Sequence, residues 1–305
     1  MSYWTRLDLR ALLTRRRWAK PLAATLAGTV IAYLLALHFL FPYGELKRWT
    51  ESQLRSAGLE ARLDGLGPGL VFGLKASSVQ IAPVGAPERA TEFRDVRVTM
   101  SFLSLLTFRP RVLLEAQAMG GAVDARWALG KQRGLTLRWT GVDLGRAPFP
   151  TSFATLGLRG RSTGALDAQL PSPELPGSRL SGTLAATITQ ARLGPGTLGG
   201  FPLPGVSLGS GQFQFKADRG RVAVQAARFE GGELDASFTG TLDVPPDGGR
   251  IGVDGTIRLL PRGKAVDDLG FLLAFLPSAR RSDGSYLSRL GGRVGSLVLS
   301  PATGP

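Results

Sequence analysis

Apolar and polar residues alternate along most of the chain after residue 58. The segments 96–100 and 135–139 alternate strictly, with Val96, Val98 and Met100 on one side of the first segment. The same alternation occurs in 70–76, 111–118, 212–216 and 233–238. A period of two is what one apolar face and one hydrated face produce in an antiparallel sheet. The pattern therefore predicts a mainly β body.

Glycine and proline interrupt these segments at short intervals. Gly-Gly pairs at 120–121, 231–232, 248–249 and 291–292 each precede a predicted strand. Glycine readily takes positive φ, so these pairs indicate hairpin turns. A phosphate cradle is the alternative, but it would require a helix behind the glycines. The body is thus expected to be a curved antiparallel sheet, arranged as a groove, a sandwich or a half-barrel.

The first 58 residues have a different pattern. Residues 21–41 contain no charged side chain, and a helix of that length just crosses a bilayer core of roughly 30 Å. Residues 1–20 carry six basic side chains against Asp8 alone. The positive-inside rule then places residues 1–20 in the cytoplasm and the rest outside it. A cleaved signal peptide is the competing interpretation, but the apolar run is long for one and lacks a small-residue cleavage site.

Two short helices are expected outside this span. Residues 44–57 have helical spacing and end at Gly58, and residues 266–275 follow the same spacing with two aspartates in the first turn. The predicted organisation is a cytoplasmic segment, a transmembrane helix, a juxtamembrane helix, a first β part, a Gly/Pro-rich connection and a second β part. Their ranges are 1–20, 21–41, 42–58, 59–144, 145–178 and 179–305.

Composition narrows the possible functions. The chain has no cysteine, which excludes disulfides and thiol chemistry, and its only histidine is His38. We interpret His38 as a neutral residue near the membrane interface, because no partner charge lies in the span. The net charge of +14 is compatible with nucleic-acid binding, but the arginines are scattered through strands with no recognition helix. A basic, hydrated surface that attracts anionic head groups is the simpler interpretation.

No catalytic set is evident. Glu233 and Asp235 share one side of a predicted strand, and Asp243 and Asp247 flank a turn. Such carboxylates can form a glycosidase pair or a calcium site, but isolated acids on the hydrated face of a sheet are usually solvated. The pair 280–281, two arginines, is expected to be a surface turn. The sequence predicts no catalytic residue, no cofactor-binding residue and no metal ligand.

The order of parts resembles that of a known family. After the apolar run come Pro42-Tyr43, the short helix and a Gly-x-Gly-Leu turn at 67–70. Asp95-Val96-Arg97-Val98 follows, then 101–106 (SFLSLL), a strand ending in Gly120-Gly121, and a C-terminal Gly-x-x-x-x-Leu-x-x-Ser-Pro at 292–301. This pattern resembles the type II secretion system protein N family (GspN) and, more distantly, the AsmA-like inner-membrane proteins. Residues 95–121 are its most specific part.

The resemblance implies two alternative functions, neither of them enzymatic. The first is a single-pass bacterial inner-membrane component of the general secretion pathway, whose partners are other secretion-system subunits of the inner-membrane platform or the secretin. The second is an AsmA-like protein whose apolar β-groove holds lipid during transfer between membranes. In both cases the body would be periplasmic, and nucleic acid is not an expected partner. An envelope enzyme that uses the four carboxylates is the third and weakest hypothesis.

Overall fold

The computed structural model describes most of the chain beyond residue 40. The described residues are 24–26, 28–29, 32, 36, 40–56, 58–69, 73–85, 90–100, 111–129, 133–146, 157–171, 179–198, 201–245, 250–275, 277–294 and 296–302. The chain divides into two compact units, Met1–Arg48 and Trp49–Pro305. All the described strands belong to the second unit.

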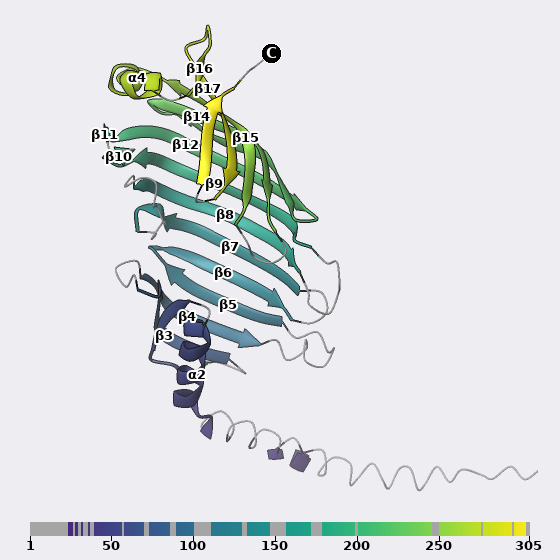
Figure 1. Cartoon of the computed structure of the whole chain (residues 1–305). Helices are drawn as coiled ribbons and strands as arrows, with labels where there is room; N and C mark the ends of the chain where they lie inside the picture. Colours follow the sequence, from purple (N-terminus) through teal and green to yellow (C-terminus); the bar gives the residue numbers. More distant parts are fainter. Residues whose placement is uncertain are drawn as a thin grey trace, which may run out of the picture. The chain divides into compact units, whose positions relative to one another are not determined.

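The second unit is built on one open antiparallel sheet of sixteen strands (Figure 1). Its order is β1-β3-β4-β5-β6-β7-β8-β9-β12-β13-β14-β15-β17-β16, with β2 paired to β3 and β18 paired to β17. The strands are β1 (Leu59–Asp64), β2 (Gly67–Pro68), β3 (Gly73–Pro83), β4 (Thr91–Met100), β5 (Arg111–Ala118), β6 (Gly121–Ala128), β7 (Arg133–Asp143), β8 (Leu158–Leu170), β9 (Ser181–Leu193), β12 (Val206–Asp218), β13 (Arg221–Gly231), β14 (Leu234–Asp243), β15 (Gly252–Pro261), β16 (Ala279–Arg280), β17 (Tyr286–Arg293) and β18 (Ser296–Pro301). A separate hairpin pairs β10 (Gly196–Leu198) with β11 (Phe201–Leu203).

The predicted mainly β, antiparallel body is confirmed. Nearly every strand pairs with its neighbour in the chain, so the sheet is a meander of hairpins. Of the three arrangements left open by the sequence, a sandwich is not found among the described residues, because all long strands belong to one sheet.

The predicted Gly/Pro-rich connection over 145–178 is wrong for its middle part. Strand β8 lies inside this range and pairs with β7 on one side and β9 on the other. Its sequence, LRGRSTGALDAQL, alternates small or apolar residues with polar ones. The glycines in it fit a strand because neighbouring side chains cover them. The sheet therefore runs without interruption from the first predicted β part into the second.

The two helices predicted outside the apolar run are confirmed. Helix α2 (Tyr43–Ser56) has Glu45 in its first turn and Arg55 in its last, which suits the helix dipole, and Gly58 follows with φ 80°. Helix α4 (Ala265–Phe275) carries Asp267 and Asp268 in its first turn. A short 3₁₀ turn, η2 (Leu144–Arg146), follows β7.

The predicted transmembrane helix over 21–41 falls mostly outside the described residues. The described residues of this range include 24–26, 28–29 and 32, which are helical. Among the described residues, no helix is both long enough and apolar enough to cross a bilayer. The membrane span therefore stays a prediction, as does the location of the body outside the cytoplasm.

A series of irregularities disturbs the register near one end of the strands. The pairing shifts between Arg94 and Arg97, where Asp95 has φ 49°, and again near Gly160 (φ 143°), Gln190 (φ 54°) and Gly209 (φ 74°). Bulges of this kind bend a strand and increase its local right-handed twist. The irregularities of β8, β9 and β12 occur at corresponding positions and act together on the α4 end of the sheet, whereas that of β4 lies closer to the middle of its strand.

The largest buried cluster lies at that same end. Ala265, Leu269 and Leu273 of α4 pack against buried side chains of β9, β12 and β14 and of the turns beside them. These side chains are Ile188, Ala191, Val206, Leu208 and Leu234. A smaller cluster lies on β3, β4 and β5 and consists of Ala76, Val96 and Ala116. The α4 end of the sheet is thus the end where a helix covers the strands.

Candidate functional site: the apolar face of the sheet

One row of apolar residues runs across almost the whole sheet. Strand register places one residue from each of thirteen strands side by side on the same face, and we call this set the central row. Its members are Leu74, Val98, Leu114, Ala125, Leu137, Leu166, Leu184, Phe215, Val224, Gly240, Gly255, Leu290 and Leu299. None of them is charged or polar. At about 4.8 Å between strands, the row extends on the order of 60 Å along the sheet.

Two further rows flank the central row on the same face. The aromatic row lies toward the α4 end and comprises Ala116, Val123, Trp139, Gly164, Ala186 and Phe213. The distal row lies toward the opposite end and comprises Met100, Val112, Trp127, Leu135, Ala168, Gly182, Ala217, Val222, Leu242, Val253, Gly292 and Leu297. Neighbouring rows are roughly 7 Å apart. We refer to the three rows together as the apolar face.

The described residues do not provide a second layer over the central row. Every member of the row is half-buried, and none is buried. Helix α4 covers residues at the strand ends, and its cluster also reaches Phe213 of the aromatic row. Soluble monomers seldom expose a continuous apolar patch of more than a few hundred Å². The central and distal rows form a strip on the order of 60 Å by 7 Å, which the aromatic row widens to about 14 Å between β5 and β12. A strip of this size reaches the upper end of this range and is typical of a surface that binds something apolar.

Three aromatic rings on this face, those of Trp139, Phe229 and Phe238, lie over glycines. A Cβ atom added to Gly164 would collide with the indole ring of Trp139. At Gly255 an added Cβ would lie 2.6 Å from the Phe238 ring, and Gly211 is covered in the same way by Phe229. These contacts cross from one strand to the next. These three rings therefore lie flat against the sheet.

The other face of the sheet is hydrated and charged. One cross-strand row on β3 to β7 reads Lys75, Arg97, Glu115, Asp124 and Arg138. All five side chains are exposed. Two of the four neighbouring pairs, Arg97–Glu115 and Asp124–Arg138, are of opposite charge and stabilise the sheet slightly, whereas the other two are like-charged. The contrast between the faces confirms the alternation read from the sequence.

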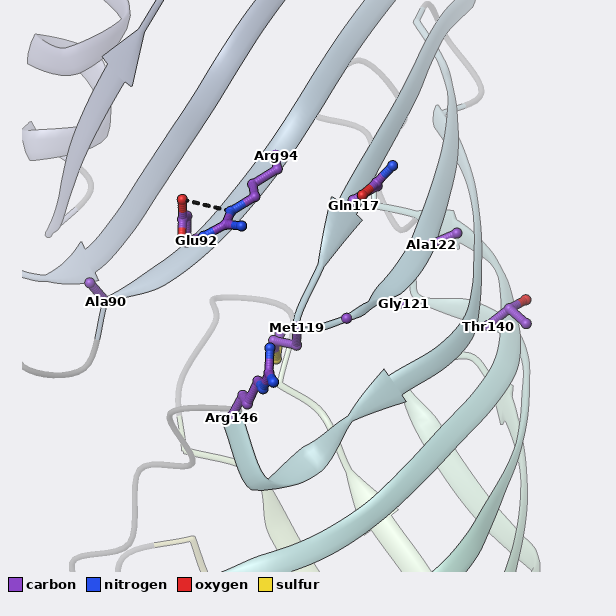
Figure 2. Close-up of a pocket in the computed structure, with 10 residues that line it drawn as sticks. Ala90, Glu92, Arg94, Gln117, Met119, Gly121, Ala122, Thr140 and Arg146 are labelled. Atoms are coloured by element: carbon purple, nitrogen blue, oxygen red, sulfur yellow. Dashed lines mark hydrogen bonds and ion pairs between the residues drawn. The ribbon is translucent and has the colours of Figure 1, made fainter.

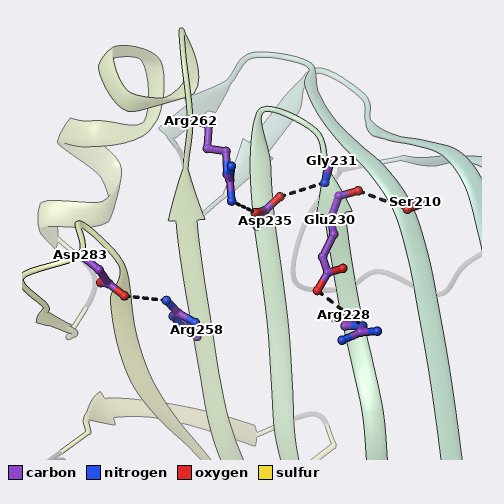
Figure 3. Close-up of polar contacts among 8 residues, drawn as sticks. All are labelled: Ser210, Arg228, Glu230, Gly231, Asp235, Arg258, Arg262 and Asp283. Atoms are coloured by element: carbon purple, nitrogen blue, oxygen red, sulfur yellow. Dashed lines mark hydrogen bonds and ion pairs between the residues drawn. The ribbon is translucent and has the colours of Figure 1, made fainter.

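Two of the acidic residues singled out in the sequence, Glu233 and Asp235, have local structural roles, and Figure 3 shows the contacts of Asp235. Glu233 Oε2 accepts a hydrogen bond from the Ser207 backbone N–H at 2.9 Å. Asp235 accepts one from Gly231 N–H at 3.1 Å and pairs with Arg262 at 2.7 Å. These contacts fix the β13–β14 turn and tie it to β15.

The acids do not converge on one site. Asp235 and Asp243 lie at opposite ends of β14, roughly 27 Å apart at the ordinary rise of a strand. Asp247 and His38 lie outside the described residues. No group of three potential metal ligands occurs in the part of the chain that the structure describes. Arg280 belongs to the short strand β16 and not to a turn, and it stacks over the Tyr286 ring at 5.8 Å. The Arg281 backbone N–H donates to Ser285 O just after this strand.

A hydrated hollow of about 580 Å³ lies beside the β5–β6 turn (Figure 2). Arg94 donates two hydrogen bonds to the Glu92 carboxylate there, at 3.0 Å each, and these lower the pKa of Glu92. Arg146, on the other side of the hollow, pairs with Asp143 at 3.4 Å. Since both arginines already bind carboxylates, the hollow offers no free charge to a ligand.

The apolar face is therefore the main candidate site. Alternation predicted its existence strand by strand, but the three continuous rows depend on register, which the sequence pattern does not specify. Comparison of the chain with protein-family models, curated proteins and solved structures found no match.

Proposed function

We propose that the apolar face binds the hydrocarbon chains of lipids, and that the protein is a non-enzymatic lipid-binding component of the bacterial envelope. In this proposal residues 21–41 anchor the chain in the inner membrane and the sheet lies in the periplasm. The observation that supports it is the central row, which is apolar across thirteen strands and nowhere buried among the described residues.

The dimensions of the face suit acyl chains. The row length, on the order of 60 Å, is about twice the thickness of the hydrocarbon core of a bilayer. Several acyl chains could lie along it end to end. Each methylene group removed from water contributes about 0.8 kcal/mol, so an acyl chain gains enough from burial to bind without a polar contact.

Crosslinking along one strand tests the proposal. A photoreactive phenylalanine analogue at Leu166 would stand on the apolar face, and the same analogue at the adjacent Ala165 would stand on the hydrated face. We expect lipid adducts from position 166 of the full chain purified from cells, and none from position 165. Equal labelling at both positions, or none at either, would count against lipid binding.

A charge on the face gives a second measurement. Leu166→Arg should reduce the amount of copurified lipid several-fold, because it places a cation among apolar rows, whereas Ala165→Arg should not. Lipid extraction and mass spectrometry of the two purified variants measure the difference. Unchanged lipid in both variants would contradict the proposal.

The secretion-pathway function remains a second proposal and rests on the resemblance over residues 95–121. Deletion of the gene should then leave secreted proteins in the periplasm, and normal secretion would exclude this role. The Leu166→Arg variant separates the two proposals. A secretion subunit that uses other surfaces should still restore export when it carries this substitution, whereas a lipid-binding protein should lose its function.

A further inference from the structure

The strand ends opposite α4 carry a concentration of arginine. We call these ends and the turns that join them the far rim. Besides Arg111 at the start of β5, which has a contact of its own, six arginines on it lie on or beside β7, β9, β12, β13, β15 and β17. They are Arg133, Arg179, Arg219, Arg221, Arg250 and Arg293, and all are exposed except Arg133, which is half-buried.

The two ends of the sheet differ in how many of their arginines pair with carboxylates. At the α4 end several arginines pair with carboxylates: Arg94 with Glu92, Arg258 with Asp283, and Arg262 with Asp235 (Figures 2 and 3). Three others at that end, Arg159, Arg161 and Arg192, are exposed and form no ion pair with a carboxylate of the described residues. On the far rim, none of the six arginines forms an ion pair with a carboxylate of the described residues.

Carboxylates are few on the far rim. Among the described residues the acids at these strand ends are Asp218 and Asp243. Both stand opposite Arg221 in the register. They therefore partly balance the charge of Arg221, although neither forms an ion pair with it. The remaining five arginines leave the rim with a clear positive excess.

Exposed apolar side chains gather on the same rim. Val298 is 64% exposed, Val294 51% and Trp127 44%, and Leu297, Ile251 and Met100 are 36–39% exposed. At the α4 end, the large hydrophobic residues of similar exposure among the described residues are Val84 and, on α4 itself, Val266. Two independent features, unpaired arginines and exposed apolar residues, thus coincide on one end of the sheet.

This combination fits the surface of an anionic bilayer. Arginine attracts phosphate head groups, while aliphatic residues and tryptophan enter the interface between head groups and acyl chains. A soluble anion would gain nothing from the apolar residues, and a neutral protein partner nothing from the unpaired arginines.

We propose that the far rim docks on the surface of a membrane that contains anionic lipids. The distal row of the apolar face begins at this rim and includes its exposed residues Met100, Trp127 and Leu297. A docked rim therefore brings bilayer lipid to the edge of the apolar face without a polar barrier between them. This docking goes beyond the proposed binding of acyl chains and is tested separately from it.

Because the chain contains no cysteine, a single introduced cysteine can be labelled at a chosen position. The full chain is held in nanodiscs and labelled with a fluorophore at Val294→Cys on the far rim or at Val84→Cys at the α4 end. Both residues are similarly exposed, at 51% and 54%. Brominated lipid, which quenches the fluorophore on contact, is supplied in the disc and in added vesicles, with or without phosphatidylglycerol.

We expect quenching at position 294 and not at 84, and only when phosphatidylglycerol is present. Raised salt should weaken it, because exposed charges are screened. Replacing Arg219, Arg250 and Arg293 by glutamine should reduce binding about five-fold for each arginine removed. The matched control replaces Arg94, Arg146 and Arg228 by glutamine, which removes the same charge at the α4 end and should leave quenching unchanged.

Three results would overturn the docking proposal. The first is no quenching at position 294 by the lipid of the disc or by the lipid of the vesicles. The second is equal quenching at positions 294 and 84. The third is an equal loss of quenching in the two triple variants. Lipid crosslinks at position 166 do not depend on the rim arginines in the purified chain. Crosslinks without quenching would therefore refute the docking proposal and leave lipid binding by the apolar face intact. Quenching without crosslinks would refute lipid binding by the apolar face and leave the docking proposal intact.

Discussion

The indole ring of Trp139 lies over Gly164 of the adjacent strand, and its Nε1–H donates a hydrogen bond to Ser162 Oγ at 2.9 Å. Ser162 is buried, at 5% exposure. The hydrogen bond therefore fixes the polar edge of the ring. The glycine has no side chain and so leaves room for the rest of the ring to lie flat against the sheet. This arrangement keeps one of the two tryptophans of the apolar face from occupying the space where a ligand would lie.

Gly164→Val should displace this ring. The new side chain would collide with the indole and with the Ala185 carbonyl, and overpacking of this kind costs about 1–3 kcal/mol. Urea unfolding of the full chain and tryptophan fluorescence measure the change. Gly134→Val is the control, because an added Cβ there meets only the Ala128 Cβ at 3.8 Å. Equal destabilisation by both substitutions would show that the ring does not matter.

Helix α4 should depend on two leucines. Leu269 and Leu273 are 5% and 3% exposed in the buried cluster, and replacing a buried leucine by alanine costs about 2–5 kcal/mol. Leu269→Ala should therefore loosen α4 and speed hydrogen exchange of its amides. Val266→Ala, at a position that is 47% exposed, should change stability by less than about 0.5 kcal/mol. Unaltered exchange in Leu269→Ala would mean that the cluster does not hold the helix.

The turn before β17 should be sensitive to acid. Hydrogen bonds from the Ser285 hydroxyl and backbone N–H, followed by Arg258, lower the pKa of Asp283 from 3.8 to about 2. Because the folded pKa is depressed, the stabilisation is complete above pH 3.8 and is lost as pH falls toward 2. Carboxyl NMR titration should find this midpoint. Asp283→Asn should remove the acid dependence of this turn, and a midpoint near 3.8 would contradict the hydrogen bonds.

Glu51 should protect the first edge of the sheet. Its Oε1 accepts a hydrogen bond from the backbone N–H of Leu63 on edge strand β1, at 3.2 Å. Unpaired edge groups invite pairing with other chains. Glu51→Ala should speed hydrogen exchange at Leu63 several-fold and cost about 1 kcal/mol. Gln53→Ala, on the same helix but exposed, should leave that amide unchanged, and equal effects would point to loss of helix stability instead.

Local patterns predict individual elements well where the signal lies within one segment. Two aspartates and an apolar repeat predict a helix over 266–275, and helix α4 begins one residue earlier, at Ala265. Strand β8 escapes prediction because its small residues resemble a loop when read alone. They fit a strand only because Trp139 on β7 covers Gly164, a contact that joins residues far apart in the chain.

The arginines of the far rim show the same limit. In the sequence they are scattered and indicate only a general basic surface. Hairpin connections bring Arg219, Arg250 and Arg293 to one end of the sheet, while pairing with acids neutralises others at the opposite end. A charge pattern of this kind depends on where each turn falls in the fold.

The sequence by itself determined that the body is an antiparallel β structure with one apolar and one hydrated face, because the period of two is a property of each strand alone. Only the tertiary structure decided that these faces join into rows across thirteen strands, that aromatic rings lie over glycines, and that arginines collect at one rim. Those features depend on register and on contacts between distant strands, and the alternation of residues within a strand carries no information about either.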